Sequence, residues 1–185
     1  LYAGRFGIGG RSPQRLLEAL AQVRSRGCEL MLDVVGQQAA GVTAMLAEAE
    51  AAGLVRAIDE VDYGRATAMM CAADALVLIQ APSAGRVQAV AGKTYDYLRS
   101  GRPIMVVAPE GDNLELIRRH AAALESGDTS VGGTAGALER LYRRWRAGEF
   151  ACESQPDPAF LERYERRALT CELAAHFDRL VGRER

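Results

Sequence analysis

The residues best suited to chemistry lie at the front of the stretch 91–107, AGKTYDYLRSGRPIMVV: Gly92, Lys93, Thr94, Tyr95 and Asp96. A short helix is predicted over 94–99, after a glycine that permits a tight turn. Lys93 and the amides of Thr94 and Tyr95 are expected to point out of the helix N-terminus, where an anion is favoured. Asp96 adds a carboxylate that accepts hydrogen bonds from hydroxyl groups. Together these groups suit a nucleotide diphosphate sugar.

Two arginines flank a glycine-rich segment near the start of the chain. Arg5 and Arg11 enclose the sequence FGIGG. A guanidinium group binds phosphate through two parallel hydrogen bonds, so the pair is suited to clamp a diphosphate. The alternative is that both are solvated surface arginines. Lys93 has the same alternative, and Asp96 has that of a charge that offsets the helix dipole.

Hydrophobic patterning predicts the elements that position these residues. Strands are predicted over 1–4, 29–35, 54–58, 75–79, 104–107 and 122–125. Helices are predicted over 13–23, 39–52, 62–73, 94–99, 113–120, 136–147 and 159–180. This alternation predicts an α/β fold: a Rossmann-like parallel sheet of about six strands with helices on both faces. Ligands bind such sheets at the carboxyl ends of the strands, where strand order reverses. The loops after the first and fourth predicted strands are therefore expected to meet at one crevice.

The segment GKTYDYLRSGRPI resembles the helix–glycine–proline signature in the C-terminal half of group 1 (family 4) glycosyltransferases of the GT-B fold. In that family an acidic residue five positions before the glycine binds the donor ribose, and Asp96 holds that place before Gly101. Many members carry a glutamate eight positions earlier that contacts the donor sugar. This sequence has Gln88 there, which makes Gln88 a candidate sugar contact.

The same resemblance implies further contacts to the donor. The family carries a basic pair after its first strand, which Arg5 and Arg11 match. Its donor base lies near the loop after the third strand, which makes Glu60 and Val61 candidate base or sugar contacts. The family is retaining and transfers a sugar from a nucleotide diphosphate to an acceptor hydroxyl. It usually requires no metal, and no cofactor besides the donor substrate is expected.

The resemblance also implies an organisation in domains. Residues 1–150 are expected to form the nucleotide-sugar-binding domain, 151–158 a linker, and 159–185 a C-terminal crossover helix and tail. The chain begins without Met, and we expect an N-terminal acceptor domain outside this sequence. The 185-residue chain is then expected to be inactive, with no catalytic residue assigned within it.

Composition narrows the classes of partner. The net charge of −1 gives no general attraction to nucleic acid or to an anionic membrane. Peripheral membrane association is therefore expected only through the N-terminal acceptor domain expected outside this sequence. Residues 1–185 contain no signal peptide and no apolar run of the ~20 residues that span a bilayer, and a cytoplasmic protein is expected.

Two other functions remain open at this level. A different GT-B enzyme, such as a sugar-nucleotide 2-epimerase, would bind the same kind of ligand. A non-catalytic, flavodoxin-like regulatory domain is the second alternative, and Arg5 argues against it, because a phosphoacceptor domain needs acidic residues at that strand end.

Overall fold

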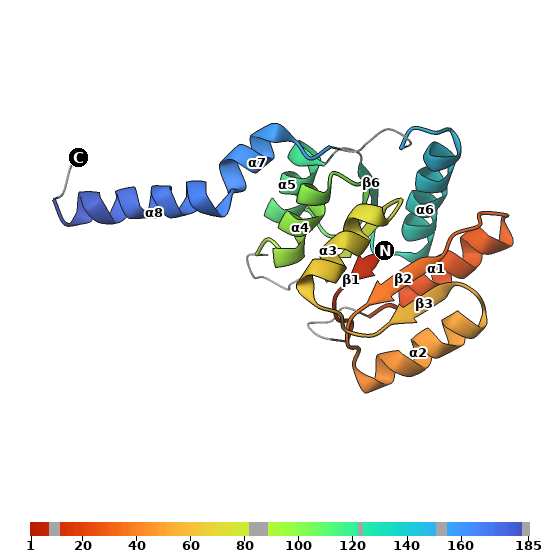
Figure 1. Cartoon of the computed structure of the whole chain (residues 1–185). Coiled ribbons are helices and arrows are strands. Elements are labelled where there is room, and N and C mark those ends of the chain that lie inside the picture. The colour runs from red at the N-terminus through yellow and green to blue at the C-terminus, as the bar shows by residue number, and fades with distance from the viewer. Residues whose placement is uncertain (8–11, 82–88, 122–123, 151–154, 183–185) are drawn as a thin grey trace.

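The computed structural model describes residues 1–7, 12–81, 89–121, 124–150 and 155–182 (Figure 1). The strands are β1 (Tyr2–Ala3), β2 (Leu32–Val35), β3 (Val55–Ile58), β4 (Leu76–Ile79), β5 (Ile104–Val107) and β6 (Leu124–Gly127). The helices are α1 (Gln14–Ser25), α2 (Ala40–Ala51), α3 (Tyr63–Ala72), α4 (Gly92–Ser100), α5 (Asp112–His120), α6 (Val131–Arg146), α7 (Pro158–Tyr164) and α8 (Arg166–Leu180).

The described strands form two parallel ladders, in the orders β1-β2-β3 and β4-β5-β6. The ladders meet where β1 lies beside β4: the Leu1 nitrogen donates to the Ala75 carbonyl at 2.8 Å, and the Val77 amide donates to the Leu1 carbonyl at 2.8 Å. The resulting order, 3-2-1-4-5-6, is that of a Rossmann fold and differs from the flavodoxin order. This strand order contradicts the flavodoxin-like fold that the second alternative assumed.

Helices cover both faces of this sheet, as the alternating pattern predicted. Side chains of α1, α2 and α6 pack into one core, and side chains of α3, α4, α5 and α7 pack into the other. Successive residues of β5 divide between them: Met105 and Val107 enter the first core, whereas Ile104 and Val106 enter the second. All four are buried, because side chains alternate along a strand and both faces of the sheet are covered.

Helix α6 begins earlier than its predicted start at 136. Ser130 caps it by accepting a hydrogen bond from the Gly133 amide at 3.0 Å. Three glycines near this start lower the helix propensity, which is why the predicted start was too late. The cap at Ser130 and the packing of α6 on α1 outweigh this unfavourable propensity. Strand β6 is also displaced from its predicted position at 122–125.

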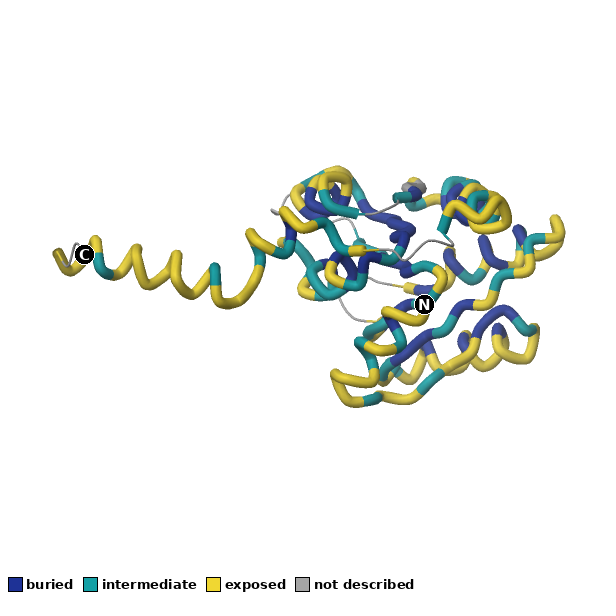
Figure 2. Tube along the Cα trace, turned by 45° about the horizontal axis from the view of Figure 1, so that its top comes forward, coloured by how far each residue is buried: buried dark blue, intermediate teal, exposed yellow. Residues whose placement is uncertain are grey.

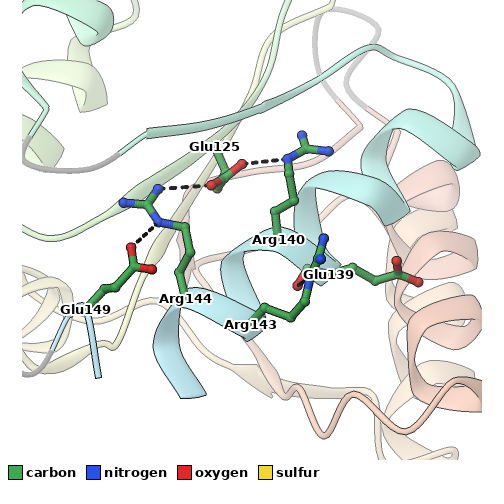
Figure 3. Close-up of polar contacts among 6 residues, drawn as sticks. All are labelled: Glu125, Glu139, Arg140, Arg143, Arg144 and Glu149. Atoms are coloured by element: carbon green, nitrogen blue, oxygen red, sulfur yellow. Dashed lines mark hydrogen bonds and ion pairs between the residues drawn. The ribbon is translucent and has the colours of Figure 1, made fainter. Parts of the chain in front are cut away.

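A buried carboxylate ties α6 to β6 (Figure 3). Glu125 accepts hydrogen bonds from Arg140 Nε at 2.8 Å and from Arg144 Nη1 at 2.9 Å. Arg144 also donates to Glu149 at 2.6 Å. Burial alone would raise the pKa of the Glu125 carboxyl, but the hydrogen bonds from the two arginines bring the pKa below its ordinary value.

The prediction of one long helix over 159–180 is wrong. The chain leaves helical geometry at Glu165, where ψ is 138°, and α7 and α8 lie on either side. Helix α7 packs on the body of the domain through Phe160, which is buried. Helix α8 has no buried residue and extends away from the body (Figure 2). Its exposed apolar residues are Leu169, Leu173, Phe177 and Leu180. No helix among the described residues is long and apolar enough to cross a membrane.

Candidate functional site

The first and fourth strands bring their following residues together, as the strand pattern predicted. Gly4 follows β1, and Lys93 lies in the first turn of α4. A Cβ atom placed on Gly4 would lie only 2.5 Å from Lys93 Nζ, and the backbone φ of +136° also disfavours any other residue there. The glycine therefore provides the space that the lysine side chain occupies at the carboxyl edge of the sheet.

The ammonium group of Lys93 is held over an aromatic pair. Its Nζ lies 4.0 Å from the centroid of the Tyr2 ring. The Tyr2 ring in turn stacks on Phe6, with centroids 3.9 Å apart and planes 10° from parallel. A cation over the face of an aromatic ring is attracted by the ring quadrupole. Lys93 is thus not the solvated surface lysine of the alternative interpretation; its positive charge is fixed where β1 ends.

Gln38 shapes the start of the loop that follows β1. Its Nε2 donates to the carbonyls of Gly4 at 3.0 Å and Gly36 at 2.6 Å, and its Oε1 accepts from the Phe6 amide at 2.8 Å. Arg5 lies between Gly4 and Phe6, whose backbones Gln38 holds, and its side chain is exposed. Sequence reasoning missed Gln38; the available signal was a polar residue just after a buried strand, at the carboxyl edge.

The expectation of a free Thr94 amide is wrong. Because α4 begins at Gly92, the Thr94 amide donates to the Ala91 carbonyl at 2.9 Å. The first amide of the helix is instead that of Gly92, for which an α-helix supplies no acceptor of its own.

The Thr94 side chain also turns inward. It is fully buried, and its hydroxyl donates to Asn113 Oδ1 at 2.6 Å. Asn113 Nδ2 donates in turn to Gln80 Oε1 at 2.6 Å. This chain of bonds, which sequence reasoning missed, fixes α4 to α5 and to the end of β4. Thr94 therefore holds the N-terminus of α4 in place through its buried side chain.

The two tyrosines of α4 serve packing. Tyr95 is half-buried, and its ring centroid lies 6.3 Å from that of Phe160 and 5.6 Å from that of Tyr164. Tyr97 is fully buried, and its hydroxyl accepts a hydrogen bond from the Ala3 amide at 2.9 Å. Burial raises the pKa of Tyr97 well above its ordinary value. Tyr97 thereby joins α4 to β1.

Asp96 lies on the side of α4 that faces the start of α3. It is half-buried, and its Oδ1 accepts a hydrogen bond from the Tyr63 hydroxyl at 2.8 Å. Glu60 and Val61 precede α3 in the loop after β3, with Glu60 exposed and Val61 half-buried. The predicted ribose and base contacts thus belong to neighbouring elements. Sequence reasoning missed Tyr63.

Two of the predicted donor contacts, Arg11 and Gln88, lie outside the described residues. Within the described part of the chain, no three His, Cys, Asp or Glu side chains are grouped so that they could hold a metal ion.

A pocket of about 630 Å³ opens on the α1 and α6 side of the same edge. Its walls come from the starts of α1 and α6 and from the ends of β4 and β5. The polar lining includes Gln14, Arg15, Gln80 and Thr134. Arg15 donates to the Thr129 carbonyl at 2.9 Å and closes one wall. Gln80 also belongs to the hydrogen-bonded chain that runs through Asn113 to Thr94 of α4.

No family model matches the sequence, and no curated protein matches it. Solved structures do match the fold. The GtfA/B complex matches with a TM-score of 0.66 and 12% identity, over 96% of this chain and 35% of that chain. HepE from Anabaena, in complex with UDP and glucose, matches with a TM-score of 0.64 and 13% identity, over 96% of this chain and 48% of that chain. WaaG, a glycosyltransferase involved in lipopolysaccharide biosynthesis, matches with a TM-score of 0.63 and 17% identity, over 95% of this chain and 46% of that chain.

The chain spans between about a third and a half of the length of these structures. At such low identity the likeness establishes the fold. The strand order 3-2-1-4-5-6 and the two helical layers agree with it. The chain therefore has the Rossmann-like fold of part of a GT-B glycosyltransferase, as the resemblance of its 92–107 stretch predicted.

Proposed function

We propose that this chain is the donor-binding, C-terminal domain of a retaining glycosyltransferase that transfers a sugar from a nucleotide diphosphate to an acceptor hydroxyl. The observation that carries the proposal is the arrangement at the start of α4. There a fixed ammonium group lies where β1 ends, the Gly92 amide opens helix α4, and the Asp96 carboxylate of the same helix meets the start of α3. The HepE structures, which hold UDP with glucose or UDP-glucose, support the same class of ligand.

Each part of the donor has a matching group in this arrangement. Lys93, the Gly92 amide and Arg5 would bind the diphosphate and stabilise its charge as it leaves, which requires no metal ion. Asp96 would accept hydrogen bonds from the ribose. Glu60 and Val61 would lie near the base. Thr94 would act only by holding α4 in place.

The acceptor side of the reaction would come from a second domain that faces the carboxyl edge. The matched structures are two to three times as long as the part that this chain covers. The exposed apolar face of α8 would pack on that domain, as a crossover helix does. The pocket beside Gln80 opens on the same edge, where the transferred sugar would meet the acceptor.

A calorimetric titration tests the ribose assignment. Asp96→Ala should weaken UDP binding by about ten- to a hundredfold, because a hydrogen bond to a charged acceptor is lost. It should not weaken the binding of 2′,3′-dideoxyuridine diphosphate, which lacks the hydroxyls. Lys93→Ala should weaken both ligands, and added salt should shrink that effect.

Asp178→Ala, on the distant helix α8, is the matched control and should leave both affinities unchanged. Equal weakening of both ligands by Asp96→Ala would show that the carboxylate is only a helix-end charge. Absence of UDP binding by the unaltered chain would refute the proposed function itself.

A further inference from the structure

Tyr63 is an exposed tyrosine with a fixed hydroxyl group. It is the first residue of α3 and 68% of it is exposed, yet its hydroxyl donates a 2.8 Å hydrogen bond to Asp96 Oδ1. The bond joins two helices at the carboxyl edge of the sheet. The start of α3 is itself held in place, because Asp62 caps the helix by accepting from the Arg65 amide at 2.9 Å.

The bond between Tyr63 and Asp96 is not what docks the two helices. Met70 and Ala66 of α3 pack in the same apolar cluster as Tyr97 and Leu98 of α4. Tyr63 belongs to neither apolar core of the described chain. A hydrogen bond made at the surface adds little to stability, and holding a long side chain in place costs conformational entropy. The geometry therefore favours a role at the ligand site.

We propose that Tyr63 is a positioning residue that holds the Asp96 carboxylate in the orientation that a ribose requires. This inference rests on the proposed function. An ionised carboxylate has about four lone-pair sites, and the tyrosine hydroxyl occupies one of those on Oδ1. Oδ2 and the remaining site on Oδ1 can then accept from the two neighbouring hydroxyls of a ribose. Without Tyr63 the carboxylate rotates among several orientations, which binding must first suppress.

The expected effect follows from that lost preorganisation. Ordering one side chain on binding weakens affinity by about three- to tenfold. Tyr63→Phe, which removes only the hydroxyl, should weaken UDP binding by that factor. It should leave the binding of 2′,3′-dideoxyuridine diphosphate unchanged, because that ligand has no hydroxyls for Asp96. The melting temperature should also stay unchanged.

A double-mutant cycle distinguishes positioning from direct contact. If Tyr63 acts through Asp96, Tyr63→Phe has no further effect on UDP affinity in an Asp96→Ala background. Additive losses would overturn the inference. Tyr142→Phe, on α6, is the matched control and should not change the affinity of either ligand.

The outcomes separate this inference from the proposed function. If the unaltered chain prefers UDP over the dideoxy ligand and Tyr63→Phe keeps that preference in full, Tyr63 has no positioning role and the donor assignment stands. If Tyr63→Phe tightens UDP binding, the hydroxyl occupies the place of a ribose hydroxyl and the inference is wrong. If the unaltered chain binds neither ligand, the proposed function fails first.

Discussion

At the scale of single residues, Gly4 and Lys93 form one geometric unit, because the glycine leaves room for the lysine side chain. Gly4→Ala should displace the ammonium group, since the new Cβ would lie 2.5 Å from Nζ and the lysine end is the part that can move. We expect UDP affinity to fall about as far as in Lys93→Ala. The double variant should lose little more than either single variant. Titration calorimetry measures all three.

The matched control for this prediction is Gly27→Ala. Gly27 also has a positive φ, of +87°, but a Cβ placed there meets nothing within 4 Å. Both alanine variants carry backbone strain, so both should lose some stability. Only the variant at Gly4 should lose affinity for UDP. An equal loss from both would mean that backbone strain, and not displacement of the lysine, sets the affinity.

At the scale of elements, the Glu125 carboxylate makes the docking of α6 dependent on pH. Its pKa lies below the ordinary value of 4.5, so its stabilising contribution is complete above that pH. The contribution is lost as the pH falls through the lower pKa of the folded state. Glu125→Gln should reduce the free energy of unfolding at pH 7 by about 1–2 kcal/mol, and urea denaturation at pH 7 and pH 3 should show this difference shrinking in acid.

Glu110→Gln is the control for the glutamate prediction. Glu110 also accepts two hydrogen bonds from an arginine, Arg118, at 2.6 and 2.7 Å, but both side chains lie at the surface. Exposed ion pairs contribute little to stability, so this variant should behave like the unaltered chain at both pH values. A difference between Glu125→Gln and the unaltered chain that persists in acid would contradict the account.

The loss of a phenylalanine should reduce stability strongly in helix α7 and hardly at all in helix α8. Phe160 of α7 is 1% exposed and packs against Tyr164 and His120, whereas Phe177 of α8 is 57% exposed. Phe160→Ala should lower the free energy of unfolding by about 3–5 kcal/mol, because it leaves a cavity. Phe177→Ala should change it by less than about 0.5 kcal/mol. Chemical denaturation measures both, and equal effects would mean that α8 is packed in solution.

At the scale of the whole molecule, binding and turnover should separate. The 185-residue chain covers between 35% and 48% of the structures that it matches. Catalysis requires donor and acceptor to be held together in reacting geometry. We therefore expect the chain to bind UDP but to transfer no glucose from UDP-glucose to an acceptor. Chromatography of the reaction mixture tests this, and transfer by the chain alone would contradict it.

The class of fold and the order of the strands and helices could be predicted from the sequence, because those signals are local. The glycine at 101 ends α4 with a φ of 66°, and the apolar run of β5 is buried on both faces, as each pattern predicted. The meeting of the first and fourth strand ends also followed, since parallel α/β sheets reverse their strand order at that point. Asp96 was therefore placed on the correct helix, whereas Lys93, predicted just before that helix, lies in its first turn.

The direction in which each side chain points, and the partner that it contacts, depend on segments far apart in the chain and could not be predicted in this way. Thr94 turns inward to Asn113, 19 positions away, and Tyr63 meets Asp96 across 33 positions. The helix break at Glu165 also depends on contacts between distant segments. Phe160 and Tyr164 of α7 pack on the rings of Tyr95 and His120, and α8 then extends away from the body of the domain. Such contacts depend on how helices dock against the sheet. No spacing within one segment encodes that docking, because it results from the packing of all the elements together.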